Sequence, residues 1–538
     1  MSQSTIAASY DAIPYPNLGY SHTHPDHLAT LATLLGLNPA SPEKCRVLEL
    51  GTASGWNIIP FAYAFPESQF VGIDISPIQI QEGQAAIQAL GLQNIRLEAC
   101  DILEITSDLG EFDYIIAHGV YSWVPTDVRD ALIRVCKQNL SPNGVAYISY
   151  NTYPGSYMTR MVREMMLYHT RNAATPFEKA EGARDFMAFL RENNTIPESG
   201  FAAFLNTYSD MLQQRLEHAT SRSNSVILHD ELAEINDALY FHEFASHAAH
   251  HGLQYLVEAE FPTVMVSNLK DPVIDAIKEF AGDIIETEQY LDFLRNRNFR
   301  KTLLCHAEIE LERTIKLERV TTFRVSSMAR PVNNELDIAS VAPEKFGASD
   351  NATFTTDHPL SKAAFFYLSE VSPQSIPFRS LFIAARNILA EFEPQPEDAA
   401  SINREAQILA ANLLQAYSYS TNLITFSLTA PRYTTELSEY PTVSPVARYL
   451  ARSSLLVPNI RHERVELDAI SHFLLLKLDG TNNRVDLMNA LLDLFGKGSF
   501  AFQINNETVT DTDKIKEILE TQLNLTMEWF THAALLVS

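Results

Sequence analysis

"VLELGTASGWNIIPFAYAF", residues 47–65, reads as a buried strand, a turn with two glycines and a helix. A loop of this kind typically holds a nucleotide-like cofactor against the start of a helix. The alternation continues to about Tyr150, with apolar strands at "QFVGIDIS", "NIRLEACDI", "FDYIIAHGV" and "NGVAYISYN" separated by helices. Apolar strands that alternate with helices predict a parallel sheet covered on both faces, hence an α/β fold.

Two further strands are expected beyond a helical insertion. The pattern is helical from 157 to about 228, and "HGLQYLVEAEF" (251–261) and "FRKTLLCHAEI" (299–309) then look like strands around a helical stretch at 273–296. With the first five strands they predict a seven-stranded sheet, whose seventh strand can run antiparallel because no standard crossover need join the last two. The expected divisions are 1–156 for the N-terminal arm and cofactor-binding strands, 157–228 for the insertion and 229–315 for the remaining strands.

The composition changes after about Val325, and residues 330–538 are expected to form a C-terminal α+β domain. Two helical blocks in it resemble each other weakly: "LSKAAFFYLSEVSPQSIPFRSLFIAARNIL" parallels "DAISHFLLLKLDGTNNRVDLMNALLDLF", and a third helix and a terminal strand follow each. This order suggests tandem winged-helix-like units at about 350–430 and 440–538, and two unrelated helical hairpins are the alternative. A winged helix usually indicates DNA binding, but the acidic charge of the chain favours protein contact or substrate docking.

The composition argues against several partners. A formal net charge of −26 on 538 residues repels phosphate backbones and anionic lipid, so nucleic acid is not expected as a partner. An acidic surface suits a cationic substrate or a basic protein, and it also serves solubility alone. The four cysteines form no CxxC pair and fit a reducing compartment. Because no signal peptide and no membrane-spanning apolar run is found, we expect a cytoplasmic protein without membrane insertion.

The glycine loop departs from both common nucleotide fingerprints. The dinucleotide pattern G-x-G-x-x-G requires its second glycine where Ala53 stands and its third where Trp56 stands, and the P-loop pattern is absent. A cofactor without phosphates relaxes the need for the middle glycine, and S-adenosylmethionine is such a cofactor. Gly51 then supplies the tight turn, Gly55 lets the helix start close to the strand, and Glu49 supplies a carboxylate for the ammonium of the methionine tail.

Acidic residues also follow the next two strands. Asp74, in "GIDIS", can accept hydrogen bonds from two ribose hydroxyls, and Asp101, in "EACDIL", can accept one from an adenine amino group. Ile75 and Ile102 can enclose the adenine ring. The alternative for Asp74 is a cap for the helix that begins at Pro77, and the alternative for Asp101 is a loop acid. One acid at the end of each of three successive strands favours contact with the cofactor.

These motifs resemble a known family. "ELGTASG", "GIDIS", "ACDI" and the seven-strand plan, over roughly 1–310, are similar to class I S-adenosylmethionine-dependent methyltransferases, whose sheet is Rossmann-like. "SYDAIPYP", "THPDHLATLATLLGL", "HGVYSWVP", "SYNTYPG" and "HDELAEINDALYFHEFASHAAHHGLQYLVEAEF" resemble methyltransferases with a methyltransferase regulatory region, and this likeness covers nearly the whole chain. That group includes bacterial protein-lysine methyltransferases acting on outer-membrane proteins. The resemblance therefore implies methylation of lysine side chains of a protein substrate, with an outer-membrane protein among the candidates.

The methyl acceptor is expected beyond the fourth and fifth strands. There the sequence places four catalytic candidates, His118 and Tyr121 in "AHGVYSWVP" and Asn151 and Tyr153 in "SYNTYPG". His118 is either a general base or a histidine that shapes the loop, and the second segment either contacts substrate or packs on the sheet edge. Nitrogen methylases of DNA and glutamine often carry [ND]-P-P-[YF] at this point, and its absence argues against those acceptors.

An aromatic lid completes the expected cofactor site. Tyr10 and Tyr15, in "YDAIPYP", are expected to fold over the cofactor, unless this segment packs as a proline-fixed arm without ligand contact. The predicted cofactor contacts are Tyr10, Glu49, Gly51, Ala53, Gly55, Asn57, Asp74, Ile75, Asp101, Ile102 and His118.

Two histidine clusters are not expected to bind a metal. In "HTHPDH" (22–27) Pro25 breaks the strand spacing of a ligand pair. In "YFHEFASHAAHHG" (240–252) His247 and His251 are four apart, but the H-E-x-x-H order fails at Ser246. Structural or substrate-facing roles are favoured for both. Two other functions stay open, a small-molecule or peptide O- or N-methyltransferase and a cofactor-binding regulator without catalysis, and the sequence indicates no oligomeric state.

Overall fold

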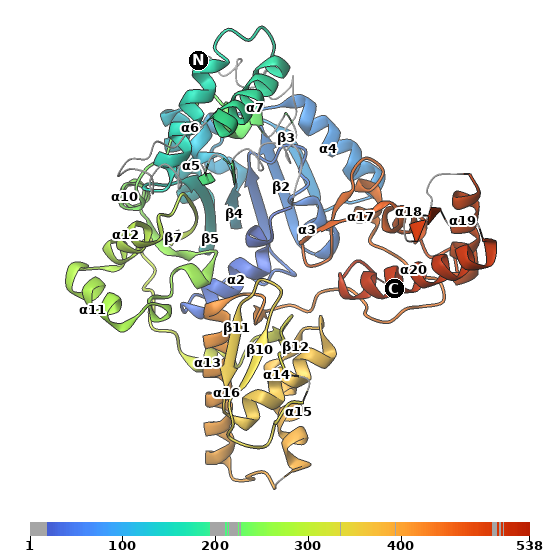
Figure 1. Cartoon of the computed structure of the whole chain (residues 1–538). Coiled ribbons are helices and arrows are strands. Elements are labelled where there is room, and N and C mark those ends of the chain that lie inside the picture. Colours follow the sequence, from blue (N-terminus) through green and yellow to red (C-terminus); the bar gives the residue numbers. More distant parts are fainter. Residues whose placement is uncertain are drawn as a thin grey trace.

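One seven-stranded sheet lies at the centre of the molecule (Figure 1). The computed structural model describes residues 19–193, 210–211, 213–214, 224, 227–333, 335–392, 394–497, 503–504, 507–508 and 511–537. The strands lie in the order β3-β2-β1-β4-β5-β7-β6. Their bounds are β1 (Arg46–Leu50), β2 (Gln69–Asp74), β3 (Ile95–Ala99), β4 (Phe112–Ala117), β5 (Leu140–Asn151), β6 (Leu253–Glu258) and β7 (Phe299–His306).

The strand directions confirm the predicted sheet. Neighbouring strands from β3 to β5 are parallel, and β7 pairs antiparallel with both β5 and β6. The Rossmann-like plan with an antiparallel seventh strand is therefore present. Because β1 to β4 are parallel, their carboxyl ends meet at one edge of the sheet, which is where open α/β sheets bind ligands.

Helices cover both faces of this sheet. One face carries α2 (Pro25–Leu34), α3 (Ile59–Ala64) and α4 (Pro77–Leu90), and the other carries α5 (Thr126–Asn139) and α10 (Phe241–His250). Val47 and Leu48 are adjacent in β1 and both fully buried, and they pack into different apolar cores. Burial on both faces explains why these strands are continuously apolar instead of alternating.

The helix after β2 begins and ends where its sequence predicts. The Ser76 hydroxyl accepts a hydrogen bond from the Gln79 amide at 3.3 Å, and Pro77 occupies the first helical position. Gly91 ends the helix in the left-handed region, at φ +68°. Since Ser76 is the capping residue, the Asp74 carboxylate is left for other partners.

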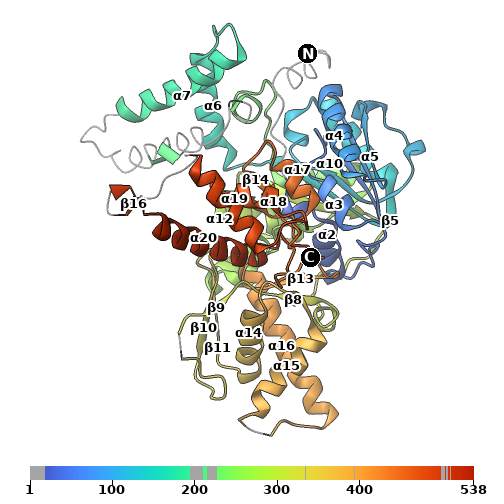
Figure 2. The same ribbon diagram turned by 90° about the vertical axis from the view of Figure 1, so that its right-hand side faces the viewer.

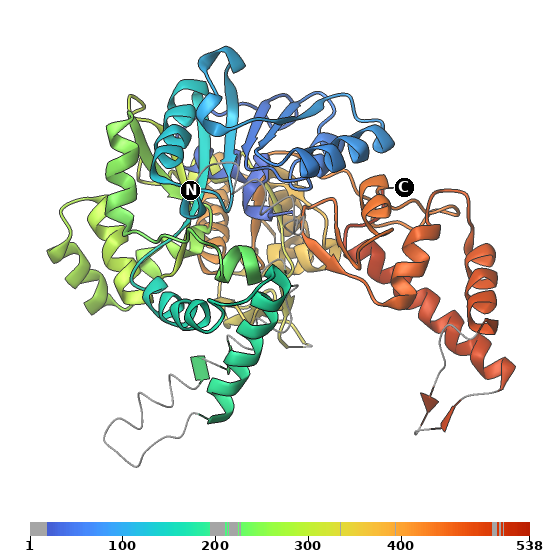
Figure 3. The same cartoon turned by 90° about the horizontal axis from the view of Figure 1, so that it is seen from above.

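The helical insertion extends away from the sheet (Figure 3). Helices α6 (Ser156–His169) and α7 (Pro176–Asn193) pack on each other around a small apolar core of their own, which includes Val162, Met166 and Met187. The extent of the insertion to 228 stays a prediction, because most of 194–226 lies outside the described residues. The helical stretch predicted at 273–296 forms two helices, α11 (Asp271–Phe280) and α12 (Ile284–Arg295), and the Asp283 side chain caps the second.

The C-terminal half contains two units of similar topology. In the first, the central strand β8 pairs with β12, which follows α14, and with β13, which follows α16. In the second, Thr442 pairs with Asp479, which follows α18, and Val443 pairs with Leu536, which follows α20. Apart from the short α17 of the second unit, each unit therefore places three helices around a segment that pairs with the chain after the first and the third of them. This shared arrangement supports the tandem interpretation.

The elements of the first unit are β8 (Arg324–Ser326), β9 (Arg330–Pro331), β10 (Glu344–Gly347), β11 (Thr353–Thr356), α14 (Pro359–Val371), β12 (Ile376–Pro377), α15 (Phe378–Ala390), α16 (Ala399–Tyr419) and β13 (Thr425–Ser427). Those of the second are α17 (Pro445–Leu450), β14 (Leu456–Pro458), β15 (Arg464–Glu466), α18 (Ala469–Lys477), α19 (Arg484–Gly496), β16 (Gln503–Ile504), β17 (Glu507–Thr508) and α20 (Thr512–His532). Figure 2 shows α17 beside α3 and α4, and α17 contacts both helices. Across the described ranges, no helix combines the length and apolar character needed to cross a membrane.

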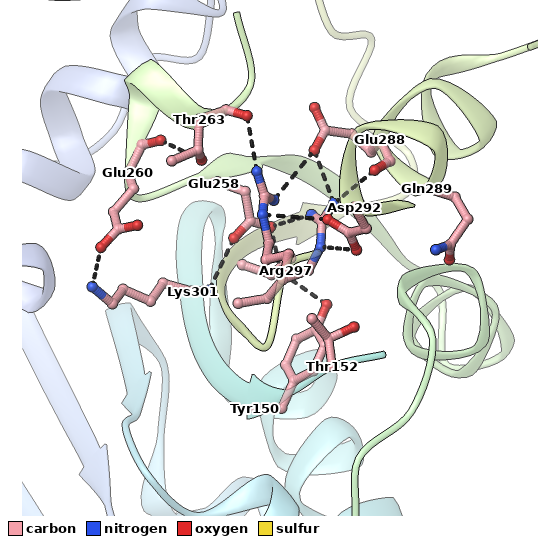
Figure 4. Close-up of polar contacts among 12 residues, drawn as sticks. Tyr150, Thr152, Glu258, Glu260, Thr263, Glu288, Gln289, Asp292, Arg297 and Lys301 are labelled. Carbon is pink, nitrogen blue, oxygen red and sulfur yellow. Dashed lines mark hydrogen bonds and ion pairs between the residues drawn. The ribbon is translucent and has the colours of Figure 1, made fainter. Parts of the chain in front are cut away.

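A buried ion cluster fastens β6, β7 and α12 together (Figure 4). The Arg300 side chain on β7 is 0% exposed, and its guanidinium lies 2.7 Å from Glu258 Oε1 and 3.0 Å from Glu288 Oε2. Asp292 Oδ1 lies 2.8 Å away, and the Phe241 ring of α10 stacks on the guanidinium at 3.8 Å. Burial raises the pKa of Glu288 to about 7, while the positive charges of Arg300 and Arg297 lower it. The buried carboxylates therefore depend on the arginines to stay ionised.

We therefore expect Arg300→Met to lower the stability of the core strongly. Removing the cation leaves three buried carboxylates without their main partner, which costs about 3–5 kcal/mol. The midpoint of thermal unfolding, followed by circular dichroism, measures the effect. The control is Arg96→Met, which removes an exposed ion pair with Glu98 and should cost about 0–1 kcal/mol. Equal shifts for the two variants would contradict this assignment.

Candidate functional site

The glycine loop between β1 and α3 is held tightly against its neighbours. The amides of Gly51 and Thr52 both donate to the carbonyl of Ile73 in β2, at 2.8 and 3.0 Å. Gly51 has φ +74°, and a Cβ added there would lie 2.5 Å from Val120 Cγ2. A side chain at Gly51 would therefore clash as well as strain the backbone. Ala53 also adopts a left-handed conformation, at φ 51°, in the position where the dinucleotide fingerprint has glycine.

The Asp74 carboxylate holds this loop from the end of β2. Its Oδ2 accepts a hydrogen bond from the Ala53 amide at 2.8 Å, and its Oδ1 accepts one from the Ser76 amide at 2.9 Å. The alternative role as the helix cap falls to Ser76 instead. Asp74 therefore lies directly beside the loop, at the edge where a ribose would be bound.

The Glu49 carboxylate is buried beneath the loop. Glu49 is only 3% exposed, and its carboxylate accepts hydrogen bonds from Thr52 Oγ1 and Asn57 Nδ2, both at 2.6 Å. Burial raises the pKa of Glu49 to about 7, while the two hydrogen bonds lower it and the Asp74 charge raises it further. Both donors are neutral, so a cationic group would stabilise the ionised form of Glu49.

The third acid follows β3. Asp101 Oδ1 accepts a hydrogen bond from the Leu103 amide at 2.9 Å and begins the short helix η2 (Ile102–Glu104). Ile102 is buried and Ile75 is half-buried. In the sheet order β3-β2-β1, Asp101, Asp74 and Glu49 thus stand at or near the ends of three adjacent strands. The sequence predicts that the three acids follow neighbouring strands, and the strand order confirms it.

His118 follows β4 at the same edge. Its Nδ1 lies 2.9 Å from the Tyr147 hydroxyl, and its ring lies 3.7 Å, centre to centre, from the ring of Tyr20. Burial lowers the pKa of His118 to about 3, with further contributions from Lys301, Arg464 and His22. His118 is therefore neutral near pH 7, and it is a weak base.

Tyr20 is a site residue that sequence reasoning missed. The lid was expected at Tyr10, which lies outside the described residues, as does Tyr15. Tyr20 is the described aromatic residue of the N-terminal segment that reaches the edge of the sheet, where it covers His118. Its only signal in the sequence is an aromatic residue after Gly19, shortly before the first helix, and this signal is too common to be informative.

Three catalytic candidates occupy different surroundings. Tyr121 is 2% exposed, and its hydroxyl lies 2.8 Å from His247 Nδ1, within the apolar core under α10. Asn151, at the end of β5, donates from Nδ2 to Asn236 Oδ1 at 2.8 Å. Tyr153 is stacked on Tyr157 with ring centres 4.0 Å apart. Tyr121 is buried in the core while Asn151 and Tyr153 lie at and beyond the end of β5, and the catalytic roles of all three stay predictions.

A group of three tyrosines, one exposed and two half-buried, lies just beyond β5. Tyr157 is 51% exposed, and Tyr240 lies 5.4 Å from Tyr153, ring centre to ring centre. Arg160 donates to the Tyr153 hydroxyl at 3.2 Å. Tyr153, Tyr157 and Tyr240 therefore present aromatic faces beside the carboxyl end of β5, and such faces attract cations.

The histidine clusters pack differently from each other. Asp130 Oδ1 accepts hydrogen bonds from His251 Nε2 at 2.9 Å and from His247 Nε2 at 3.3 Å, and these three possible ligand atoms lie within 4.8 Å of one another. In the N-terminal cluster, His24 and His27 are buried and kept neutral, since burial lowers the pKa of both. Hydrogen bonds to Asp130 thus hold one cluster and burial encloses the other, and the expected absence of a metal stays a prediction.

A second residue missed by sequence reasoning comes from the far end of the chain. His462 Nε2 lies 3.0 Å from Asn57 Oδ1, the residue that holds Glu49. The two are separated by 405 positions, so no local pattern could have paired them. The predicted cofactor residue Asn57 is thus part of a chain of contacts between the two ends of the protein.

Models of known families match three parts of the chain. Residues 41–194 match a model described as "Methyltransferase domain", and 223–306 match "Predicted methyltransferase regulatory domain". Residues 439–535 match "PKMT, C-terminal winged helix domain". The winged-helix prediction for the second C-terminal unit is therefore confirmed, and we call this unit the winged helix domain below; for 350–430 it stays a prediction.

Relatives extend the match over the whole length. Protein RP789 of Rickettsia prowazekii is 33% identical over 536 residues, which cover 98% of this chain and 93% of RP789. Two solved structures of PKMT2 from Rickettsia typhi, one of them in complex with AdoHcy, are 29% identical, with TM-scores of 0.84 and 0.85. Both alignments cover 98% of this chain and 100% of PKMT2. The chain belongs to the family of S-adenosylmethionine-dependent methyltransferases that carry a methyltransferase regulatory domain and a PKMT winged helix domain.

Proposed function

We propose that this methyltransferase methylates the side-chain nitrogen of lysine in a protein substrate. Three acids support the placement of the cofactor. Glu49, Asp74 and Asp101 lie at or near the ends of three adjacent strands, and the first two are hydrogen-bonded to the glycine loop. The protein acceptor is supported by the likeness to PKMT2 along 98% of the chain. It is supported further by the tyrosines beside β5, of which Tyr157 is exposed.

The residues at the edge of the sheet fit S-adenosylmethionine. Glu49 is a buried carboxylate with neutral donors, and an ammonium group would complete its set of partners. Asp74 is held beside the loop in a place suited to ribose hydroxyls, while Ile75 and Ile102 offer an apolar cover for adenine. When bound, S-adenosylmethionine would supply a methyl group on a sulfonium sulfur, and a neutral nitrogen that attacks the methyl carbon in line would release the sulfur as the thioether of S-adenosylhomocysteine.

The acceptor nitrogen has to lose its proton first. An unperturbed lysine has a pKa of about 10.4, and transfer into an apolar, water-poor site lowers it. His118 is neutral and adds no positive charge at this edge, and we assign it to shaping the site with Tyr20. We assign Tyr153, Tyr157 and Tyr240 to the approach of the lysine, because aromatic faces tolerate both the ammonium and its methylated products.

We further propose that the substrate is an outer-membrane protein and that it is methylated in the cytoplasm. The first rests on the resemblance of the sequence motifs to enzymes that act on such proteins. It is compatible with a net charge of −26, which attracts lysine-bearing segments. The second is supported by four cysteines that all remain free thiols, three of them buried.

Asp74→Ala tests the ribose role. Loss of the carboxylate removes its hydrogen bonds to the loop and to the ribose and leaves those donors without an acceptor. We therefore expect affinity for S-adenosylhomocysteine to fall by about 1–3 kcal/mol, roughly 5- to 150-fold. Isothermal titration calorimetry measures the affinity. The matched control is Asp108→Ala, an exposed acid in the loop that follows β3, which should bind as the wild type does. An unchanged affinity for Asp74→Ala would remove Asp74 from the site.

The pH dependence of binding tests Glu49. Its pKa of about 7 means that the free protein carries a protonated Glu49 below that pH. Pairing with the ammonium of S-adenosylhomocysteine then requires proton release, so affinity should rise about tenfold per pH unit toward pH ~7 and level off above it. Calorimetry between pH 5 and 8 follows this change, and Glu49→Gln should bind weakly with a flatter profile. A flat wild-type profile would argue against the ion pair.

Transfer of isotope-labelled methyl tests the acceptor. The enzyme is incubated with labelled S-adenosylmethionine and a recombinant outer-membrane protein, and mass spectrometry locates the label. We expect label on lysine side chains, and none on the same protein after chemical blocking of its lysines. The Asp74→Ala enzyme serves as the catalytic control. Label confined to small molecules, or on residues other than lysine, would contradict the lysine proposal.

A further inference from the structure

The winged helix domain inserts one turn into the methyltransferase core. The turn spans 459–463 between β14 and β15, and its His462 is only 2% exposed. The His462 ring lies 4.2 Å from the ring of Phe61 in α3, centre to centre. Because α17 also contacts α3 and α4, the domain meets the core directly beside the elements that carry the cofactor loop.

His462 takes part in a short chain of hydrogen bonds that ends at Glu49. Its Nε2 lies 3.0 Å from Asn57 Oδ1, and the Asn57 amide nitrogen donates to Glu49 Oε1 at 2.6 Å. The backbone amide of Tyr20 lies 2.9 Å from the same Asn57 oxygen and 3.1 Å from His462 Nε2. With the proton on Nε2, His462 donates to Asn57 Oδ1, and so does the Tyr20 amide. The two donors together keep the oxygen on their side, so that the amide nitrogen points at Glu49.

The turn is held in this position by its own domain. The Asn459 side chain donates to the Ala533 carbonyl at 2.9 Å, and the Ile460 amide donates to the Ala534 carbonyl at 3.0 Å. His462 adopts a left-handed conformation, at φ 62°, which is unfavourable for a residue with a Cβ. A strained residue that the surroundings enforce suggests a functional role for its side chain.

Arg464, two residues after His462 at the start of β15, holds the N-terminal segment. The Arg464 guanidinium lies over the Tyr20 ring at 4.6 Å, and its Nε donates to the Gly19 carbonyl at 2.8 Å. Tyr20 is thus enclosed between Arg464 and His118. A Cβ added at Gly19 would lie 2.8 Å from the His462 ring, so the segment approaches the turn as closely as glycine permits.

We propose that His462 is a positioning residue for the cofactor, and that the winged helix domain completes the cofactor site by holding Asn57, Glu49 and Tyr20 in place. This inference rests on the proposed placement of S-adenosylmethionine at Glu49. His462 touches neither the cofactor nor the acceptor in this account. It acts through Asn57, whose Oδ1 accepts from both His462 and the Tyr20 amide. A displacement of the domain would therefore reach the cofactor through three linked side chains.

The test is His462→Asn in the full-length protein. Asparagine tolerates the left-handed backbone, but its side chain is too short to reach Asn57. We expect the dissociation constant for S-adenosylhomocysteine to rise about tenfold and the KM for S-adenosylmethionine to rise with it, while kcat changes less. His462→Gln restores the reach and should recover most of the affinity. Glu466→Gln, an exposed change on β15 of the same hairpin, should bind as the wild type does.

A double-mutant cycle separates this inference from the proposed function. In an Asn57→Ala background, His462→Asn should have no further effect, because the link is already broken. If Asn57→Ala weakens binding and His462→Asn does not, the inference is wrong and the cofactor site stands. If Asn57→Ala and Glu49→Gln both bind as the wild type does, the proposed cofactor placement fails, and the inference fails with it.

A second variant guards against misfolding. Gly19→Ala crowds the His462 ring from the core side and leaves the winged helix domain itself unchanged. It should reproduce the loss of affinity seen with His462→Asn. Wild-type affinity in Gly19→Ala, with a thermal melting curve like that of the wild type, would overturn the inference independently.

Discussion

A buried carboxylate at the end of β1 needs partners, and much of the architecture supplies them. Glu49 is held by Thr52 from the glycine loop and by Asn57 from the approach to α3. Asn57 is held in turn by the N-terminal segment and by His462 of the winged helix domain. Because an isolated buried charge is so costly, the loop, the N-terminal segment and a distant domain are tied to one group, and an ammonium ligand fits the place that they leave.

The acceptor side is organised around β5 and its antiparallel neighbour. The Arg300 cluster joins β7 to β6 and α12, and so fixes the regulatory region against the strand whose end carries Asn151 and Tyr153. The tyrosines beyond β5 include one from the insertion, since Tyr157 belongs to α6. The core thus supplies the cofactor edge, and the added segments shape what reaches it.

The cofactor edge could be predicted from sequence because its signals are local. Glu49, Asp74 and Asp101 each follow an apolar strand, and parallel strands bring their ends to one edge whatever the rest of the chain does. The winged helix at 440–538 was also predictable, from the order of its helices. Tyr20 and His462 were not, since their contacts join segments up to 442 residues apart and depend on how whole domains dock. The contact of the Tyr121 hydroxyl with His247, on a helix 126 residues later, was not predictable for the same reason.

The central claim is that the cofactor's amino acid end pairs with Glu49 at the end of β1. A crystal structure of the full chain with S-adenosylhomocysteine tests it most directly. The account predicts the amino group within hydrogen-bond distance of Glu49, about 2.7–3.2 Å or through one water, and the ribose hydroxyls at Asp74. It also predicts that the bonds from His462 to Asn57 and from Asn57 to Glu49 persist. An amino group bound elsewhere, with Glu49 left to its two neutral donors, would contradict the account.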